Sequence, residues 1–180
     1  MSNQFGMLLP VEFGPHDFEN LRLHISPTIL SDLNIISINS DNLLPASIAD
    51  DGPNATAGQA LAKWLNTSTK DGKPKQLGCH AYTSEIAELV YNFKKAFLRA
   101  TTPSASYIIQ LRLETGILKN SMEITPFELL NERTNEVLKM KKDNDFDFLL
   151  KRRQIGKTIQ WEDENLNNVI ISLSGNCIGK

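Results

Sequence analysis

The chain contains few of the residues that mark secreted or membrane-spanning proteins. Only two cysteines, Cys79 and Cys177, occur among its 180 residues, which argues against a disulfide-rich secreted scaffold. No apolar run approaches the roughly 20 residues that a transmembrane helix needs. The first residues lack a basic segment followed by an apolar core, so we expect no signal peptide. The composition therefore predicts a soluble, intracellular protein of the cytoplasm, with no transmembrane segment.

Neither sign of charge dominates the chain, although its two halves differ. Charged residues make up 22%, hydrophobic residues 41%, and the formal net charge is -2, as in an ordinary globular domain. Residues 1–90 carry 5 basic and 10 acidic residues, whereas residues 91–180 carry 14 and 11. Two interpretations stay open: two differently solvated surfaces, or an acidic half that meets the basic half of a neighbouring subunit.

Two segments have the apolar spacing of amphipathic helices. The first begins at Thr56, which can form a capping box with Gln59, and ends near Asn66. The second begins at Thr83 or Ser84, either of which can cap it. Its stripe of large apolar residues at helical spacing consists of Ile86, Leu89, Val90, Phe93 and Phe97. This stripe predicts a helix that packs on a sheet or against a protein partner.

A third helix is predicted at Thr125, with Pro126 as its first residue and Glu128 in its first turn. Strands are predicted from alternating or β-branched apolar residues in the segments 5–13, 21–25, 33–38, 107–113, 117–124, 146–148, 157–161 and 169–173. We therefore expect an α+β fold, a mostly antiparallel β-sheet with about three α-helices packed on it. A single domain would span residues 1–180, with a mobile loop or internal boundary at 67–76.

No motif in the sequence predicts a catalytic residue, a metal site or a cofactor. Gly156-Lys157-Thr158 resembles the end of a phosphate-binding loop, but Lys151 stands where that loop needs an earlier glycine. Residues 143–154 resemble a calcium loop, but Phe148 and Gln154 occupy the positions of its glycine and its last glutamate. We therefore expect neither a nucleotide nor a calcium ion at these segments.

Two further features keep alternative functions open. Cys79-His80 precedes the second helix, and a helix N-terminus favours a reactive thiolate, so a small enzyme with a cysteine nucleophile is one alternative. Basic residues form the second feature, a cluster of Lys139, Lys141, Lys142, Lys151, Arg152, Arg153 and Lys157. With aromatic residues nearby, this basic cluster would suit a nucleic acid or an anionic membrane surface, although several aspartates interrupt it.

The absence of catalytic motifs and the different charges of the two halves favour a non-catalytic role. Our first hypothesis is a structural or adaptor protein that acts through protein–protein contacts and self-assembles as a homo-oligomer. Asn, Ile and Lys account for 16, 16 and 13 residues, a bias typical of AT-rich genomes. One form of this hypothesis is therefore a viral or phage structural or assembly component. The nucleic-acid or membrane-binding module and the enzyme with a cysteine nucleophile remain alternatives.

Overall fold

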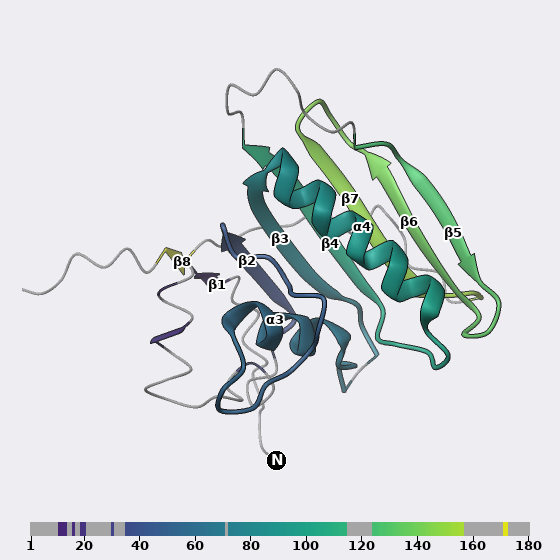
Figure 1. The fold of residues 1–180 in the computed structure, drawn as a ribbon, viewed down its shortest axis with the longest axis horizontal. Coiled ribbons are helices and arrows are strands. Elements are labelled where there is room, and N and C mark those ends of the chain that lie inside the picture. Colours follow the sequence, from purple (N-terminus) through teal and green to yellow (C-terminus); the bar gives the residue numbers. More distant parts are fainter. Residues whose placement is uncertain are drawn as a thin grey trace, which may run out of the picture.

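The computed structural model describes residues 11–13, 16, 19–20, 30, 35–70, 72–114, 124–156 and 171–172. Its elements are β1 (Val11–Phe13), β2 (Ser37–Asp41), α3 (Ala57–Asn66), β3 (Lys75–Tyr82), α4 (Thr83–Arg99), β4 (Tyr107–Glu114), β5 (Phe127–Asn131), β6 (Glu136–Lys142), β7 (Asp147–Gln154) and β8 (Ile171–Ser172). The strands form one sheet in the order β5-β6-β7-β4-β3-β2-β1-β8. Both helices lie on the same face of this sheet (Figure 1), so the fold fits the predicted α+β class.

The sheet is mixed, which differs from the mostly antiparallel sheet that the sequence predicts. Strands β8, β1, β2, β3 and β4 pair in parallel, whereas β4, β7, β6 and β5 pair antiparallel. The helices explain the parallel pairs β2–β3 and β3–β4, because α3 between β2 and β3, and α4 between β3 and β4, return the chain to the same end of the sheet. Alternating apolar residues assign the faces of a strand, but they do not assign its direction relative to its neighbours.

The core lies between the sheet and the two helices. Alternate residues of β3 and β4 face the helices and are buried, namely Leu77, Cys79, Ala81, Tyr107, Ile109 and Leu111. The predicted apolar stripe of α4 packs on them. Four of its residues are buried, and the Phe93 ring meets the Tyr107 ring edge-on, with 5.8 Å between the ring centroids. The stripe therefore packs on the sheet, one of the two alternatives that the sequence leaves open.

The predicted start of α3 is confirmed. Thr56 Oγ1 accepts a hydrogen bond from the Gln59 N–H at 3.2 Å, and Gln59 Oε1 accepts one from the Thr56 N–H at 2.8 Å. The preceding chain lies directly on the first turn of the helix, where the Ala46 N–H donates to the Gly58 carbonyl at 2.9 Å. A Cβ atom at position 58 would lie 2.9 Å from the Leu44 carbonyl oxygen, so this close approach requires a glycine.

The boundaries of the other predicted elements agree with the structure to different degrees. Helix α4 begins at Thr83 with Tyr82 as its N-cap, so the prediction that Thr83 or Ser84 caps it is wrong. Glu85 accepts a hydrogen bond from the Tyr82 N–H at 3.0 Å. The predicted strand at 33–38 begins later, as β2, and the predicted strand at 146–148 extends to Gln154, as β7. The predicted strands at 21–25 and 157–161, and most of the one at 117–124, lie outside the described residues. The last two residues of the segment 67–76 belong to β3.

No helix begins at Thr125, so that prediction is wrong, and the helices whose bounds the structure gives are α3 and α4. The chain forms β5 there, which pairs antiparallel with β6. Phe127 and Leu129 both face the helices, as every second residue of a strand does. The Asn131 side chain accepts hydrogen bonds from two backbone N–H groups of the turn, at 3.0 and 3.4 Å, and Asn135 adopts a positive φ of 54°. The helix signal is local, and the pairing of β5 with β6 overrides it.

Candidate functional site

The structure splits the predicted basic cluster between both faces of the sheet and a turn. Four members point away from the helices on β6 and β7: Lys139, Lys141, Lys151 and Arg153. Arg152 points the opposite way, into the core, with 7% of its surface exposed. Lys142 lies at the end of β6, where it pairs with Asp145 at 3.1 Å. Lys157 lies outside the described residues.

The members of the cluster on the outer face do not form a continuous cationic surface. Lys139 is bound to Glu128 at 2.5 Å, which neutralises its charge locally. Lys151 is 2% exposed, so it presents almost no surface to a phosphate backbone. Because phosphate recognition depends on accessible cations, this arrangement supports a nucleic-acid or membrane interface less than the sequence suggests.

Cys79 and His80 lie on opposite faces of β3. Cys79 faces the helices with 2% of its surface exposed, and burial raises the pKa of its thiol to about 12, although a hydrogen bond with Ser40 partly offsets this rise. His80 points to the other face, where its Nδ1 atom lies 3.2 Å from an Asp41 carboxylate oxygen. A thiol with this pKa carries almost no thiolate at neutral pH, so the geometry gives no support to a cysteine nucleophile.

The charges of the described residues separate toward opposite ends of the strands. The parallel strands β2, β3 and β4 end together, and the turn between β6 and β7 lies at the same end because Arg112 pairs in register with Asp147. Helix α4 also begins here (Figure 1). Exposed carboxylates gather at this end, which we call the acidic end: Asp41, Glu85, Glu114, Asp143 and Asp145.

The opposite end of the strands carries basic residues. Helix α4 ends there, the turn between β5 and β6 lies beside it, and the loop after α3 enters β3 at the same end (Figure 1). We call this the basic end, and it consists of Lys70, Lys73, Arg99 and Arg133, which are exposed, and Arg153, which is half-buried. Glu132 is an exposed acidic residue of the same turn. The described part of the molecule is therefore electrically polar along the strand direction.

Ion pairs neutralise the cations that lie within the acidic end. Arg112 Nε donates to an Asp147 carboxylate oxygen at 2.9 Å, and Asn144 Nδ2 donates to the other oxygen at 2.6 Å. Burial raises the pKa of Asp147, but these two hydrogen bonds and the nearby positive charges outweigh burial and hold that pKa below its usual value. Asp147 therefore stays ionised and fixes Arg112, so this arginine adds little positive field to the surrounding carboxylates.

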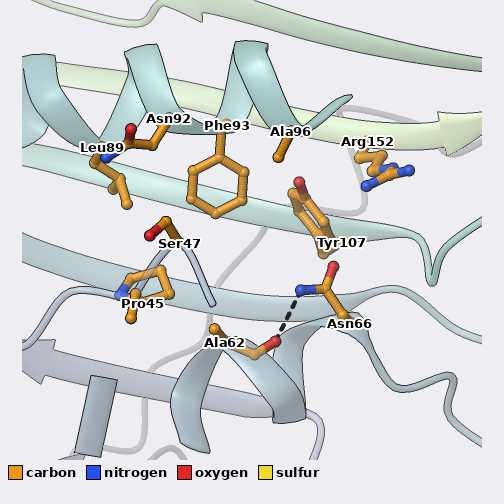
Figure 2. A pocket seen from close by; sticks show the side chains of 11 residues that line it. Pro45, Ser47, Ala62, Asn66, Leu89, Asn92, Phe93, Ala96, Tyr107 and Arg152 are labelled. Carbon is orange, nitrogen blue, oxygen red and sulfur yellow. Dashed lines mark hydrogen bonds between the residues drawn. The ribbon is translucent and has the colours of Figure 1, made fainter. Parts of the chain in front are cut away.

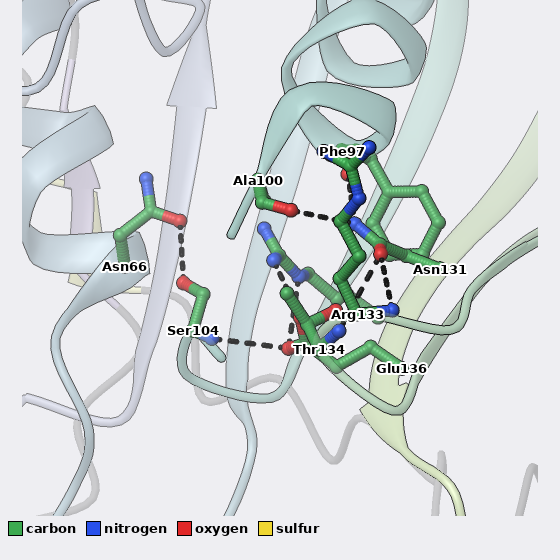
Figure 3. Close-up of polar contacts among 9 residues, drawn as sticks. Asn66, Phe97, Ala100, Ser104, Asn131, Arg133, Thr134 and Glu136 are labelled. Atoms are coloured by element: carbon green, nitrogen blue, oxygen red, sulfur yellow. Dashed lines mark hydrogen bonds and ion pairs between the residues drawn. The ribbon is translucent and has the colours of Figure 1, made fainter. Parts of the chain in front are cut away.

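A network of hydrogen bonds holds the basic end in place (Figure 3). Asn131 Nδ2 donates to the carbonyls of Phe97 and Ala100 at 2.7 and 3.0 Å, and so caps the last turn of α4. The same asparagine closes the turn that carries Arg133. Ser104 extends the network, because its hydroxyl donates to Asn66 Oδ1 at 3.1 Å at the end of α3. The ends of both helices and the β5–β6 turn are thereby linked.

A buried ion pair lies beneath this network. Arg152 donates from Nε and from a terminal nitrogen to the two carboxylate oxygens of Glu136, at 3.2 and 2.8 Å, and both side chains are almost fully buried. The Ser104 N–H donates to the same carboxylate at 3.1 Å. Tyr107 lies against this pair, and burial raises the pKa of its hydroxyl well above the usual range, although Arg152 partly offsets the effect. The pair is a structural element of the core and not an accessible site.

A small pocket opens between α3, α4 and the segment 45–47 (Figure 2). Its polar lining includes Ser47, Asn66, Asn92 and the Arg152 that pairs with Glu136. The pocket has a volume of about 60 Å³, far below the roughly 300–1,000 Å³ of typical ligand pockets. It has room for water-sized guests, and its size excludes an ordinary metabolite.

The fold and its two charged ends are thus those of an α+β protein with a polar charge distribution. Comparisons with protein-family models, with curated proteins and with solved structures found no match to this chain. Neither α3 nor α4, the helices of the described residues, is long and apolar enough to cross a membrane. The part of the chain that the structure describes contains no group of three or more His, Cys, Asp or Glu residues that could hold a metal ion.

The separation of charge into two ends was only partly foreseeable. The different charges of residues 1–90 and 91–180 signal that the chain is polar. They do not give the axis, because the acidic end draws Asp41 from one half and Asp145 from the other. Sheet register brings these two residues to the same end, and no local sequence pattern encodes it.

Proposed function

We propose that the protein is a non-catalytic structural protein that assembles head to tail with copies of itself, the acidic end of one copy against the basic end of the next. The single observation that carries this proposal is the opposite charge of the two ends of the strands. Complementary surfaces of this kind attract one another and set a preferred orientation. A contact between two different ends of identical copies is heterologous, and such contacts repeat into rings or filaments.

The strength of this contact follows from the exposure of its charges. Exposed ion pairs contribute only about 0.2–1 kcal/mol each, so several pairs are needed for stable association. Salt weakens them, because the Debye length falls from about 30 Å at 0.01 M to about 3 Å at 1 M ionic strength. We therefore expect assembly that depends on protein concentration and is lost at high salt.

Multi-angle light scattering at low and high ionic strength tests the proposal. At about 0.01 M ionic strength the weight-average mass should rise with concentration beyond that of a dimer, and at about 1 M it should return to the monomer. A mass that stays monomeric in both conditions would overturn head-to-tail assembly. A strict dimer would also overturn it, because a closed two-fold dimer uses the same patch twice and leaves nothing to extend.

Charge reversal at one end tests which surface is used. Arg99→Glu with Arg133→Glu should abolish the low-salt assembly, because the two reversals cancel the net positive charge of the basic end. Lys95→Glu is the matched control for the single variant Arg133→Glu, which makes the same change in charge. Lys95 is exposed on α4 but lies outside the set of residues that defines the basic end. Equal loss of assembly in the control would mean that total charge, and not the basic end, drives association.

A further inference from the structure

An open hollow at the acidic end combines an aromatic ring with carboxylates. It has a volume of about 540 Å³ and is lined by Arg112, Leu113, Asn144, Asp145, Phe146 and Asp147. Phe146 is 52% exposed, so about half of its surface is accessible to a partner. Beside it, the side chain of Asp145 is 86% exposed. An uncovered aromatic face next to an accessible carboxylate is the combination that binds organic cations.

The turn that carries Phe146 is held in one conformation. Asn144 Oδ1 accepts hydrogen bonds from the N–H groups of Phe146 and Asp147, both at 2.9 Å. The Asp143 N–H donates to the Asp147 carbonyl at 2.9 Å, and the Leu113 N–H donates to the Phe146 carbonyl at 2.8 Å. The ring is therefore positioned before any partner arrives, which reduces the entropy lost on binding.

The charge at the hollow favours a cation over an anion. Arg112 lies in the wall, but its Nε atom is bound to Asp147 at 2.9 Å. Lys142 pairs with Asp145 at 3.1 Å, yet both of these side chains are well exposed, so an incoming cation can compete with an exposed pair of this kind. A guanidinium group suits the hollow better than an ammonium group, because it stacks flat on a ring while it donates to a carboxylate.

We infer that this hollow binds the guanidinium group of Arg133 from the next copy in the assembly, a conclusion that rests on the proposed head-to-tail function. Arg133 is exposed at the tip of the β5–β6 turn, at the basic end of the molecule. Its backbone N–H donates to Asn131 Oδ1 at 3.0 Å, so the turn presents the side chain from a fixed base. In the contact, the guanidinium group lies on the Phe146 ring and donates to the Asp145 carboxylate.

A double-mutant cycle on the low-salt association constant tests the pairing. Phe146→Ala and Arg133→Gln should each weaken association about two- to fivefold, and the double variant should be no weaker than the weaker single variant. Ile48→Ala is the control, since Ile48 is an exposed apolar residue, 67% exposed, outside the acidic end. If the fold-losses in association constant of the two single variants multiply in the double variant, the residues act independently and the inference is overturned.

A competition experiment with the wild-type chain tests the chemistry of the site. L-argininamide should reduce the low-salt assembly more than the same concentration of L-lysinamide, which matches its charge but cannot stack as a planar group. Equal inhibition by the two amides would overturn the guanidinium site. If assembly is salt-sensitive but Phe146→Ala and Arg133→Gln leave it unchanged, the inference is wrong and the proposed function stands. If the wild type never assembles, both are wrong.

Discussion

Removal of Arg152 should destabilise the protein more than any exposed substitution, because it leaves a buried charge without its partner. Only 1% of the Glu136 side chain is exposed, and Arg152 supplies two of the three hydrogen bonds that its carboxylate receives. Breaking a buried pair by removing one partner costs about 3–5 kcal/mol. Arg152→Met should therefore lower the free energy of unfolding by about that amount, out of the roughly 5–15 kcal/mol typical of a domain.

The double variant separates the buried charge from the loss of packing. Glu136→Gln added to Arg152→Met removes the charge while an amide oxygen remains to accept from the Ser104 N–H. Its free energy of unfolding should recover by about 1–3 kcal/mol relative to Arg152→Met, since an unpaired buried charge costs more than a neutral amide. Urea denaturation followed by circular dichroism measures both variants. A loss below about 1 kcal/mol in Arg152→Met, or no recovery in the double variant, would refute this reasoning.

Three further outcomes follow from close packing and burial. Gly58→Ala should lower the melting temperature, because its Cβ would lie 2.9 Å from the Leu44 carbonyl; a gain in stability, as for an ordinary helix glycine, would contradict the close approach. Burial lowers the pKa of Lys75 to about 8. Between about pH 8 and pH 10.5 the folded chain therefore binds fewer protons than the unfolded chain, and the free energy of unfolding should rise with pH. Lys75→Met should flatten this rise in urea titrations. Cys79 should resist thiol-specific reagents in the native state, and rapid labelling without denaturant would show that the thiol is accessible.

Local and periodic signals predicted the elements whose stability depends on nearby residues. The capping box at Thr56 and the apolar stripe of α4 both appear where the sequence places them, because each depends on contacts within one helix and on one buried face. The segment at Phe127 shows the limit of such signals. A local helix start competes there with a strand pairing to residues about ten positions further on, and the pairing prevails.

Charged residues were harder to place than apolar ones. Arg152 and Arg153 are adjacent in the sequence, but in a strand they face opposite sides, so one is buried with Glu136 and the other is half-exposed at the basic end. Because successive side chains of β7 point to opposite faces of the sheet, basic residues that are continuous in the sequence are separated in the structure. The acidic end depends on register across β2, β3, β4 and β7, which a single sequence does not specify.

A mixing experiment tests head-to-tail assembly most directly. The variant Lys73→Glu/Arg99→Glu/Arg133→Glu carries two acidic ends, and the variant Glu114→Lys/Asp143→Lys/Asp145→Lys carries two basic ends, so each alone should stay monomeric at low ionic strength. Mixed in equal amounts, they should assemble again, because acidic and basic ends then alternate along the chain of subunits. Light scattering of the mixture should show a mass above that of a dimer, and a mixture that remains monomeric would contradict the account.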